Sequence, residues 1–279
     1  MTEERNSDPT LFDADVLGPG PAPPHQRVAL TVAYDGTAFH GFAVNPGVAT
    51  VGGSLVEALQ RILGHPIELT CAGRTDKGVH AHGQVVDFVT GADVDLDALV
   101  RSVNSLCGPE VAVRDPRRVA DEFSSRFDAT ARRYRYTIHN DLTPDPFSVN
   151  TAWHVKEPLD LDRLRLAVDP FLGTHDFTSF CRKATAADGS EKSLVRDVLD
   201  ARWERLDGSG LRLWIQATSF CHQMVRSVVG TMVEVGRGRL TPGDVRGILE
   251  ARDRSAAGPV APPQGLTLWE VTYPAPSDR

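Results

Sequence analysis

The stretch Val28-Ala29-Leu30-Thr31-Val32-Ala33-Tyr34-Asp35-Gly36-Thr37 marks the point where the ordered fold begins. Large apolar side chains alternate with smaller residues from Val28 to Tyr34. This period of two predicts a β-strand with one buried face. The tripeptide Asp35-Gly36-Thr37 then predicts a turn, because aspartate and glycine favour the tight backbone that a turn requires.

The elements that follow complete one alternating α/β pattern. A capping box of Ser54 and Glu57 predicts a helix that runs to Leu63. Further apolar patterns predict strands at 67–71 and 84–89, a helix at 96–103 and a short strand at 111–114. The order β-α-β-β-α-β is that of a ferredoxin-like unit, with two helices on one side of a sheet.

The second half of the chain repeats this order of elements without repeating the sequence. Strands are predicted at 133–139, 193–203, 211–218 and 266–273, with helices at 162–172, at 225–233 and from 241 onward. Gly236 is a suitable C-terminal stop for the helix at 225–233. We therefore predict an α+β fold: two ferredoxin-like halves form one extended, mainly antiparallel sheet, with helices on one face and an open central cleft between the halves.

The domain organisation follows from these patterns. Residues 1–26 are acidic and rich in proline and glycine, which predicts a disordered tail. The N-terminal α+β half is expected at 27–130, the C-terminal half at 131–274, and a short tail at 275–279.

Composition narrows the class of protein. The chain has 279 residues, of which 41% are hydrophobic, enough to bury a substantial core. It contains neither an apolar run of about 18 residues, the length that a membrane span needs, nor a secretory signal pattern. The four cysteines are far apart and lack a Cys-x-x-Cys spacing, so we expect neither a disulfide nor a structural zinc, and a reducing cytoplasm fits this pattern.

The charge distribution leaves two interpretations open. A net charge of −7 argues against a nucleic-acid partner, although part of that charge lies in the N-terminal tail. Arginines cluster at 114–118 and at 126–135, and a local basic groove can bind RNA on an acidic protein. The alternative is that these arginines form an ordinary solvated face.

The candidate catalytic stretch is Ala72-Gly73-Arg74-Thr75-Asp76-Lys77-Gly78-Val79-His80, between two predicted strands. Its glycines permit a tight backbone path and close approach of a ligand. A carboxylate with cationic neighbours stays ionised, so Asp76 is suited to act as a base or nucleophile. From these residues alone, however, such a turn is more often a structural loop with a solvated salt bridge. His80, His82 and Cys71 also suggest a metal site, but their spacing matches no common ligand pattern, and ordinary packing is the alternative.

Several blocks in order resemble the TruA family of tRNA pseudouridine synthases. The loop around Asp76 is similar to the family's catalytic loop. Further similar blocks are Tyr34-Asp35-Gly36-Thr37, Phe127 to Tyr136, Gly173 to Phe180, Met224 to Gly230, and Gly265 to Leu268. They extend from about Val28 to Tyr273.

The resemblance implies an isomerase that converts uridine to pseudouridine in the anticodon arm of tRNA, at positions 38–40, as a cytoplasmic homodimer without cofactor or metal. Asp76 would be the catalytic carboxylate, and Arg74, Tyr134 and Arg226 would bind the substrate. Each of these three has a plainer alternative. Arg74 would pair with Asp76 or a carbonyl, Tyr134 would be a core residue, and Arg226 would pair within its own helix.

Two departures from the family pattern concern RNA contacts. The chain has Gly41-Phe42-Ala43-Val44-Asn45 where the family often has Gly-Trp-Gln-x-Gln, and Thr50-Val51-Gly52 where it often has Thr-Val-Gln.

Three rival functions remain open. They are an inactive RNA-binding protein, a nucleoside hydrolase, which would normally need a second carboxylate, and a pseudouridine synthase acting on another RNA. The sequence also leaves open whether Asp76 attacks the uridine covalently or abstracts a proton from the sugar.

Overall fold

A computed structural model of the chain describes residues 25–182 and 193–274. The first half contains β1 (Gln26–Tyr34), α1 (Val51–Leu63), β2 (Thr70–Cys71), β3 (His80–Thr90), α2 (Leu96–Cys107) and β4 (Val111–Val119). The second half contains β5 (Ala131–Asn140), β6 (Trp153–Val155), α3 (Leu161–Val168), β7 (Gly173–Asp176), β8 (Val195–Arg205), β9 (Gly210–Ala217), α4 (Met224–Gly236), α5 (Asp244–Ala251) and β10 (Leu266–Thr272). The α+β class is confirmed.

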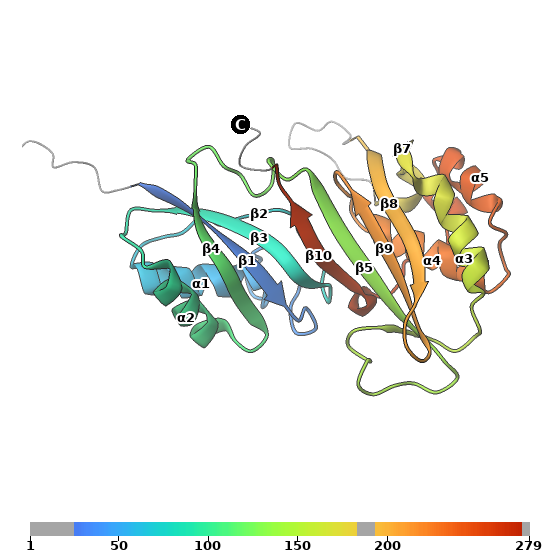
Figure 1. Cartoon of the computed structure of the whole chain (residues 1–279), viewed down its shortest axis with the longest axis horizontal. Coiled ribbons are helices and arrows are strands. Elements are labelled where there is room, and N and C mark those ends of the chain that lie inside the picture. The colour runs from blue at the N-terminus through green and yellow to red at the C-terminus, as the bar shows by residue number, and fades with distance from the viewer. Residues whose placement is uncertain (1–24, 183–192, 275–279) are drawn as a thin grey trace, which may run out of the picture.

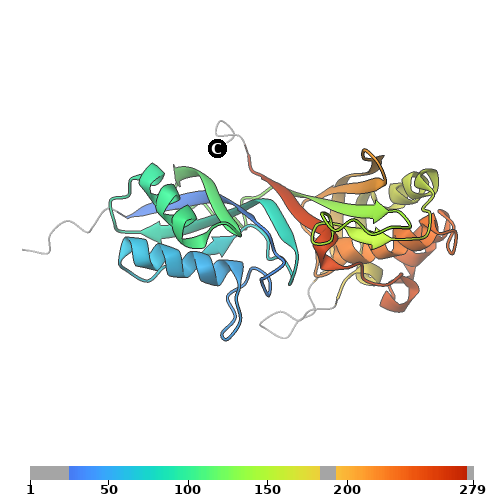
Figure 2. The same cartoon turned by 90° about the horizontal axis from the view of Figure 1, so that it is seen from below.

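One mostly antiparallel sheet runs through both halves. Its strand order is β4-β1-β3-β10-β5-β9-β8-β7, with β2 paired to β3 and β6 paired to β5. The halves join where β10, the last strand of the chain, pairs in parallel with β3 through Thr267 and Leu268. Figures 1 and 2 show α1 and α2 at one end of this sheet and α3 to α5 at the other, with β3 and β10 between them.

The core lies between the sheet and the helices. Val28, Leu30 and Val32 of β1 are fully buried, as the alternation predicted, and belong to the same apolar cluster as Leu55 and Leu59 of α1. Burying a side chain of this size contributes about 1.5–3 kcal/mol, so this face fixes the register of β1. Among the described residues, no helix is long and apolar enough to cross a membrane.

Several predicted boundaries were wrong. Helix α1 begins at Val51 with Thr50 as its N-cap, and the Thr50 hydroxyl accepts a hydrogen bond from the N–H of Gly53. The predicted cap at Ser54 was therefore too late. Gly52 and Gly53 lie in the first turn, and glycine is a poor helix former, so the residue pattern does not indicate a helix there. Strand β2 has only two residues, and β4 extends to Val119. The helix predicted at 162–172 ends at Val168 and continues as a 3₁₀ turn containing Pro170.

The tails lie mostly outside the described residues. Of the predicted tail 1–26, residues 1–24 are outside them, whereas Gln26 already belongs to β1, so the boundary was placed slightly too late. The predicted tail 275–279 is also outside them.

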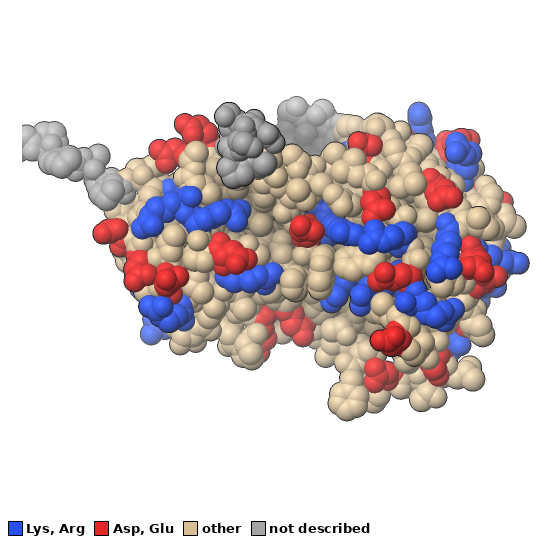
Figure 3. Space-filling model, viewed as in Figure 1, with Lys and Arg blue, Asp and Glu red and all other residues tan. Residues whose placement is uncertain are grey.

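The arginine cluster at 126–135 is divided between the two faces of the sheet, because neighbouring residues of a strand point to opposite sides. Arg126 and Arg132 line the large pocket described below. Arg133 and Arg135 instead lie over the rings of Trp214 and Trp269, with the guanidinium carbons 4.9 and 4.0 Å from the ring centres. Figure 3 shows basic and acidic side chains interspersed over the face of the sheet that it displays. The clusters therefore do not form a single basic groove.

Candidate active site

The loop between β2 and β3, which carries Asp76, is held by buried hydrogen bonds. Gln84, fully buried in β3, binds Gly73 through both atoms of its side-chain amide: Oε1 accepts from the Gly73 N–H and Nε2 donates to the Gly73 carbonyl. The Tyr34 hydroxyl lies 2.7 Å from Oγ1 of Thr75, and the Phe42 N–H donates to the Thr75 carbonyl at 3.1 Å. Thr75 is thus fixed on both sides, which places the next residue, Asp76.

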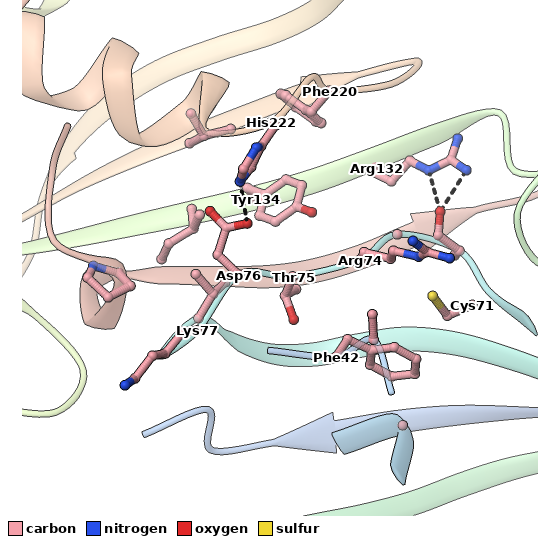
Figure 4. A pocket seen from close by; sticks show the side chains of 18 of the residues that line it. Phe42, Cys71, Arg74, Thr75, Asp76, Lys77, Arg132, Tyr134, Phe220 and His222 are labelled. Carbon is pink, nitrogen blue, oxygen red and sulfur yellow. Dashed lines mark hydrogen bonds and ion pairs between the residues drawn. The ribbon is translucent and has the colours of Figure 1, made fainter. Parts of the chain in front are cut away.

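Arg132 of β5 connects this loop to the second half of the molecule. Its guanidinium donates to the carbonyls of Ala72, Arg126, Ala129 and Thr218. Figure 4 shows the two bonds to Ala72. Burial lowers the pKa of the Arg132 guanidinium, since the charged form loses part of its hydration. These bonds to carbonyls indicate that Arg132 supports the loop and does not serve as a free ligand for an anion.

Asp76 itself is held by two basic side chains from one segment of the second half. Oδ2 of Asp76 lies 3.2 Å from Nη1 of Arg226, and Oδ1 lies 3.2 Å from Nε2 of His222. Nε of Arg226 also donates to the Ala261 carbonyl, which fixes the guanidinium. The Asp76 side chain retains 27% exposure. The carboxylate is therefore positioned, charge-compensated and still accessible.

Asp76 lies in a pocket of about 1990 Å³ formed by both halves of the chain. Six arginine and lysine side chains line it among the described residues, against the carboxylates of Glu68 and Asp76; they are Arg74, Lys77, Arg126, Arg132, Arg196 and Arg226. The excess of positive charge favours an anionic ligand such as a phosphate backbone. The pocket walls also include apolar surface, notably the ring of Phe127, which is 78% exposed.

Arg74 and Tyr134 both reach this pocket. Arg74 is exposed, and among the described residues it has neither a hydrogen bond nor an ion pair, so the expected alternative of a pair with Asp76 or a carbonyl is wrong. Tyr134 packs edge-on against Phe220 with ring centres 5.0 Å apart. Burial raises the pKa of the Tyr134 hydroxyl, and the nearby charge of Asp76 raises it further. Tyr134 is therefore a protonated, largely buried side chain in the wall beside Asp76, whereas Tyr136 is fully buried in the core.

Known proteins with similar sequences match most of this chain. Residues 167–274 match the family model described as tRNA pseudouridine synthase. A tRNA pseudouridine synthase A from Brevibacillus brevis is 40% identical over 250 residues, which cover 89% of this chain and 100% of the relative. The tRNA pseudouridine synthase A of Myxococcus xanthus is 40% identical over 247 residues, covering 88% and 92%. The chain belongs to the TruA family of tRNA pseudouridine synthases.

Solved structures add little to this assignment. A Cbf5-Nop10-Gar1 complex matches with a TM-score of 0.33 and 11% sequence identity, over 74% of this chain and 44% of that chain. A likeness this weak carries no argument about the TruA-family chain.

Three side chains in the pocket were not singled out from the sequence. His222 and Phe220 precede the Met224-Val225-Arg226 block, whose resemblance to the TruA family begins at Met224. Phe127 contributes to the resemblance only as the first residue of its block. The signal that was available is proximity in sequence: His222 is four residues before Arg226, so the two lie close together where α4 begins. Their approach to Asp76, about 150 residues away, has no signature in the sequence.

The segment in which the chain departs from the TruA pattern supports the loop and lines the pocket. Phe42 is buried, and its carbonyl accepts a hydrogen bond from the N–H of Gly52 in α1. Val44 lines the pocket and is 64% exposed. The departure therefore changes the pocket wall, whereas the backbone bond to Thr75 needs no particular side chain.

The residues considered for a metal site have other partners. His80 accepts a hydrogen bond at Nδ1 from the Gly36 N–H, so its Nε2 carries the proton that is donated to the Gln264 carbonyl. His82 stacks on Trp269 with ring centres 4.1 Å apart. Among the described residues, no three His, Cys, Asp or Glu side chains are grouped so that they could hold a metal.

The expectation that no disulfide forms was wrong. Cys181 and Cys221 are joined by a disulfide, with Cα atoms 5.8 Å apart, while Cys71 and Cys107 are free. The two cysteines are 40 residues apart, so their spacing in the sequence does not indicate that they pair. The fold brings them together because the β8–β9 hairpin returns the chain to the end of the 3₁₀ turn at Thr178–Phe180.

Proposed function

We propose that this chain is a tRNA pseudouridine synthase that isomerises uridine in the anticodon arm, at positions 38–40, with Asp76 acting at the sugar. The observation that carries this proposal is the Asp76 carboxylate, held between Arg226 and His222 inside a basic pocket. Relatives with about 40% identity are named tRNA pseudouridine synthase A, which supports the same reaction here. The reaction transfers the sugar from N1 to C5 without net redox change or hydrolysis, so its atoms balance without a cofactor.

The proposed roles of the pocket residues follow from their surroundings. A base within folded RNA must leave its stack to reach a carboxylate inside a pocket. Tyr134, largely buried beside Asp76, supplies a rigid surface for that base. Arg74 and Arg126 are pocket cations without an ion pair among the described residues, and we assign them to backbone phosphates. Arg226 is assigned to holding the carboxylate.

The decisive experiment compares Asp76→Asn with the wild-type enzyme. Single-base mapping of pseudouridine in tRNA should show loss of turnover, and filter binding should show nearly unchanged affinity for tRNA. Asp207→Asn is the matched control, because Asp207 is an exposed carboxylate outside the pocket lining, in the hairpin between β8 and β9. Retained turnover in Asp76→Asn would refute the assignment.

The same assay separates the rival functions. Release of free uracil would indicate a hydrolase, and tRNA binding without pseudouridine would indicate an inactive RNA-binding protein. Replacing the uridines at positions 38–40 of the substrate by cytidine should abolish the product. Pseudouridine at other positions or in other RNAs would contradict the proposed substrate.

We also propose that the enzyme is a homodimer in which one protomer holds the body of the tRNA while the other modifies it. The rationale is geometric, since a tRNA extends well beyond a pocket that accommodates a few nucleotides. Light scattering coupled to gel filtration should give twice the mass of one chain, and a monomer that remains active would refute this arrangement. We place the enzyme in the cytoplasm because its proposed substrate is tRNA, since the Cys181–Cys221 disulfide removes the argument from the cysteines.

We infer further that each half is a ferredoxin-like unit, with residues 27–130 and 131–274 as the two domains and the RNA-binding cleft between them. The strand orders β4-β1-β3 with β2 on β3, and β10-β5-β9-β8, support this inference because each places the last strand of its unit beside the first.

A further inference from the structure

His222 is the second side chain that contacts Asp76, and its place in the fold is well defined. It lies in the turn between β9 and α4, and Figure 4 shows its ring pointing at the carboxylate. The Arg182 N–H donates to the His222 carbonyl at 3.0 Å, and the Met224 N–H donates to the Cys221 carbonyl at 3.1 Å. The disulfide between Cys181 and Cys221 adds a covalent link next to His222. The backbone that carries the imidazole is therefore fixed.

The contact with Asp76 determines which nitrogen of a neutral His222 carries the proton. A carboxylate can only accept hydrogen bonds, so Nε2, 3.2 Å from Oδ1, must donate. Nδ1 then carries the free lone pair, and among the described residues it has no partner. When Nδ1 takes up a proton, Nε2 keeps its own and continues to donate to Asp76, so the contact is preserved. The Asp76–His222 pair is thus an oriented base with 41% exposure of the imidazole in the pocket.

Several other pocket side chains are poorly suited to accept a proton. Burial raises the pKa of the Tyr134 hydroxyl, and burial raises the pKa of the Cys71 thiol to about 11, so both remain protonated near neutral pH. Arginine and lysine side chains are donors without a free lone pair. His40 also lines the pocket, but its Nε2 lies 3.1 Å from Nζ of Lys77, and its partners do not include Asp76.

We propose that His222 is a catalytic base that removes the C5 proton of the uracil after the new bond to the sugar has formed. This proposal rests on the proposed function. When N1–C1′ breaks, its electron pair stays on the uracil, and C5 then bonds to C1′, which leaves C5 bearing both hydrogen and sugar beside an N1=C6 double bond. His222 takes the C5 proton at Nδ1, the C5–H electron pair forms C5=C6, and the N1=C6 pair moves to N1. N1 then takes up one proton, so the product is an isomer of the substrate.

The test uses His222→Gln in the full-length enzyme with tRNA that carries either hydrogen or deuterium at C5 of the target uridine. Glutamine keeps an N–H donor for Asp76 but cannot accept the proton. We expect the single-turnover rate to fall by about 10²-fold or more, the usual contribution of a general base. The deuterium isotope effect on that rate should become larger than in the wild type, because C5–H cleavage becomes limiting. The melting temperature and tRNA affinity verify that the variant is folded.

The matched control is His40→Gln, which alters another pocket histidine. Whatever its rate, its isotope effect should equal that of the wild type. The proposal is overturned if His222→Gln keeps the wild-type rate, or if it is slow with an unchanged isotope effect, since the latter means that His222 only positions Asp76. Failure of the proposed function has a different outcome: the wild-type enzyme would form no pseudouridine, or Asp76→Asn would remain active.

Discussion

Nη1 of Arg226 lies 3.2 Å from Oδ2 of Asp76, although 150 residues separate them in the chain. The guanidinium is held in turn by the Ala261 carbonyl, and its side chain is only 15% exposed. A guanidinium at this distance makes a charge-assisted contact that orients the carboxylate. The position of Asp76, in a loop of the first half, therefore depends on α4, which begins at Met224 in the second half.

Replacing Arg226 tests whether its charge contributes to turnover and not only to the stability of the fold. Arg226→Gln removes the charge at Oδ2, and we expect turnover to fall by about 10–100-fold, equivalent to the roughly 1.5–3 kcal/mol of a hydrogen bond to a charged group. Arg226→Lys should recover part of that loss. The measurement is the single-turnover rate of pseudouridine formation.

Arg237 provides the control for this variant. It also pairs with carboxylates, those of Glu157 and Glu234, and its side chain is 16% exposed, but it lies at the other end of α4. Arg237→Gln should lower the free energy of unfolding without changing turnover. Equal turnover in the Arg226 and Arg237 variants would contradict a role for Arg226 at Asp76.

Gly41 is expected to be essential to the position of the loop that carries Asp76. Its φ is +95°, and a Cβ at this position would lie 2.7 Å from the Thr75 carbonyl oxygen. Gly41→Ala should therefore both strain the backbone and displace Thr75 and Asp76. Gly47 also has a positive φ, +83°, but nothing lies within 4 Å of a Cβ there.

Comparing Gly41→Ala with Gly47→Ala separates the effect of the close contact with Thr75 from the effect of backbone strain. Both should lose about 1–2 kcal/mol from left-handed backbone strain, as measured by urea unfolding. Only Gly41→Ala should lose further stability and most of its turnover. If the two variants match in stability and turnover, the close approach to Thr75 is unimportant.

Removing the buried hydrogen bond between Tyr34 and Thr75 tests whether turnover depends on the position of Thr75, separately from the stability of the fold. Tyr34→Phe leaves Oγ1 of Thr75 without its partner 2.7 Å away, which should cost about 1–3 kcal/mol in the free energy of unfolding. We expect turnover to fall as well, because Thr75 precedes Asp76. Tyr273→Phe is the control, since it loses a 2.7 Å bond to the Ser125 carbonyl away from the loop. Its turnover should be unaffected.

The free thiol in the pocket should react slowly at ordinary pH. Burial raises the pKa of Cys71 from 9.0 to about 11. A raised pKa leaves less thiolate at a given pH, so at pH 8 alkylation of Cys71 should be about a hundredfold slower than that of an ordinary thiol and should rise steeply only as the pH approaches 11. Mass spectrometry after iodoacetamide treatment at several pH values would measure this. Fast labelling of Cys71 at pH 8 would show that the site is not buried.

The sequence predicted which helices and strands form better than it predicted the residues at which they begin and end. The period-two pattern of Val28 to Tyr34 identified β1, and the helical spacing after Leu55 identified α1, because both patterns reflect burial of one face. It missed the start of α1, where Gly52 is required because a Cβ would lie 2.6 Å from the Phe42 carbonyl oxygen. That requirement comes from tertiary contact, which a local pattern does not contain.

By itself, the sequence determined the family, the α+β class and the position of Asp76, because these depend on residue types at fixed spacing along the chain. The tertiary structure decided what surrounds Asp76. It brought His222 and Arg226 to the two carboxylate oxygens and placed Arg132, but not Arg133, in the wall of the pocket. It also joined Cys181 to Cys221. The physical reason is that each of these contacts joins elements far apart in the chain, and their approach is set by the pairing of β10 with β3 and by the path of the chain from β9 into α4.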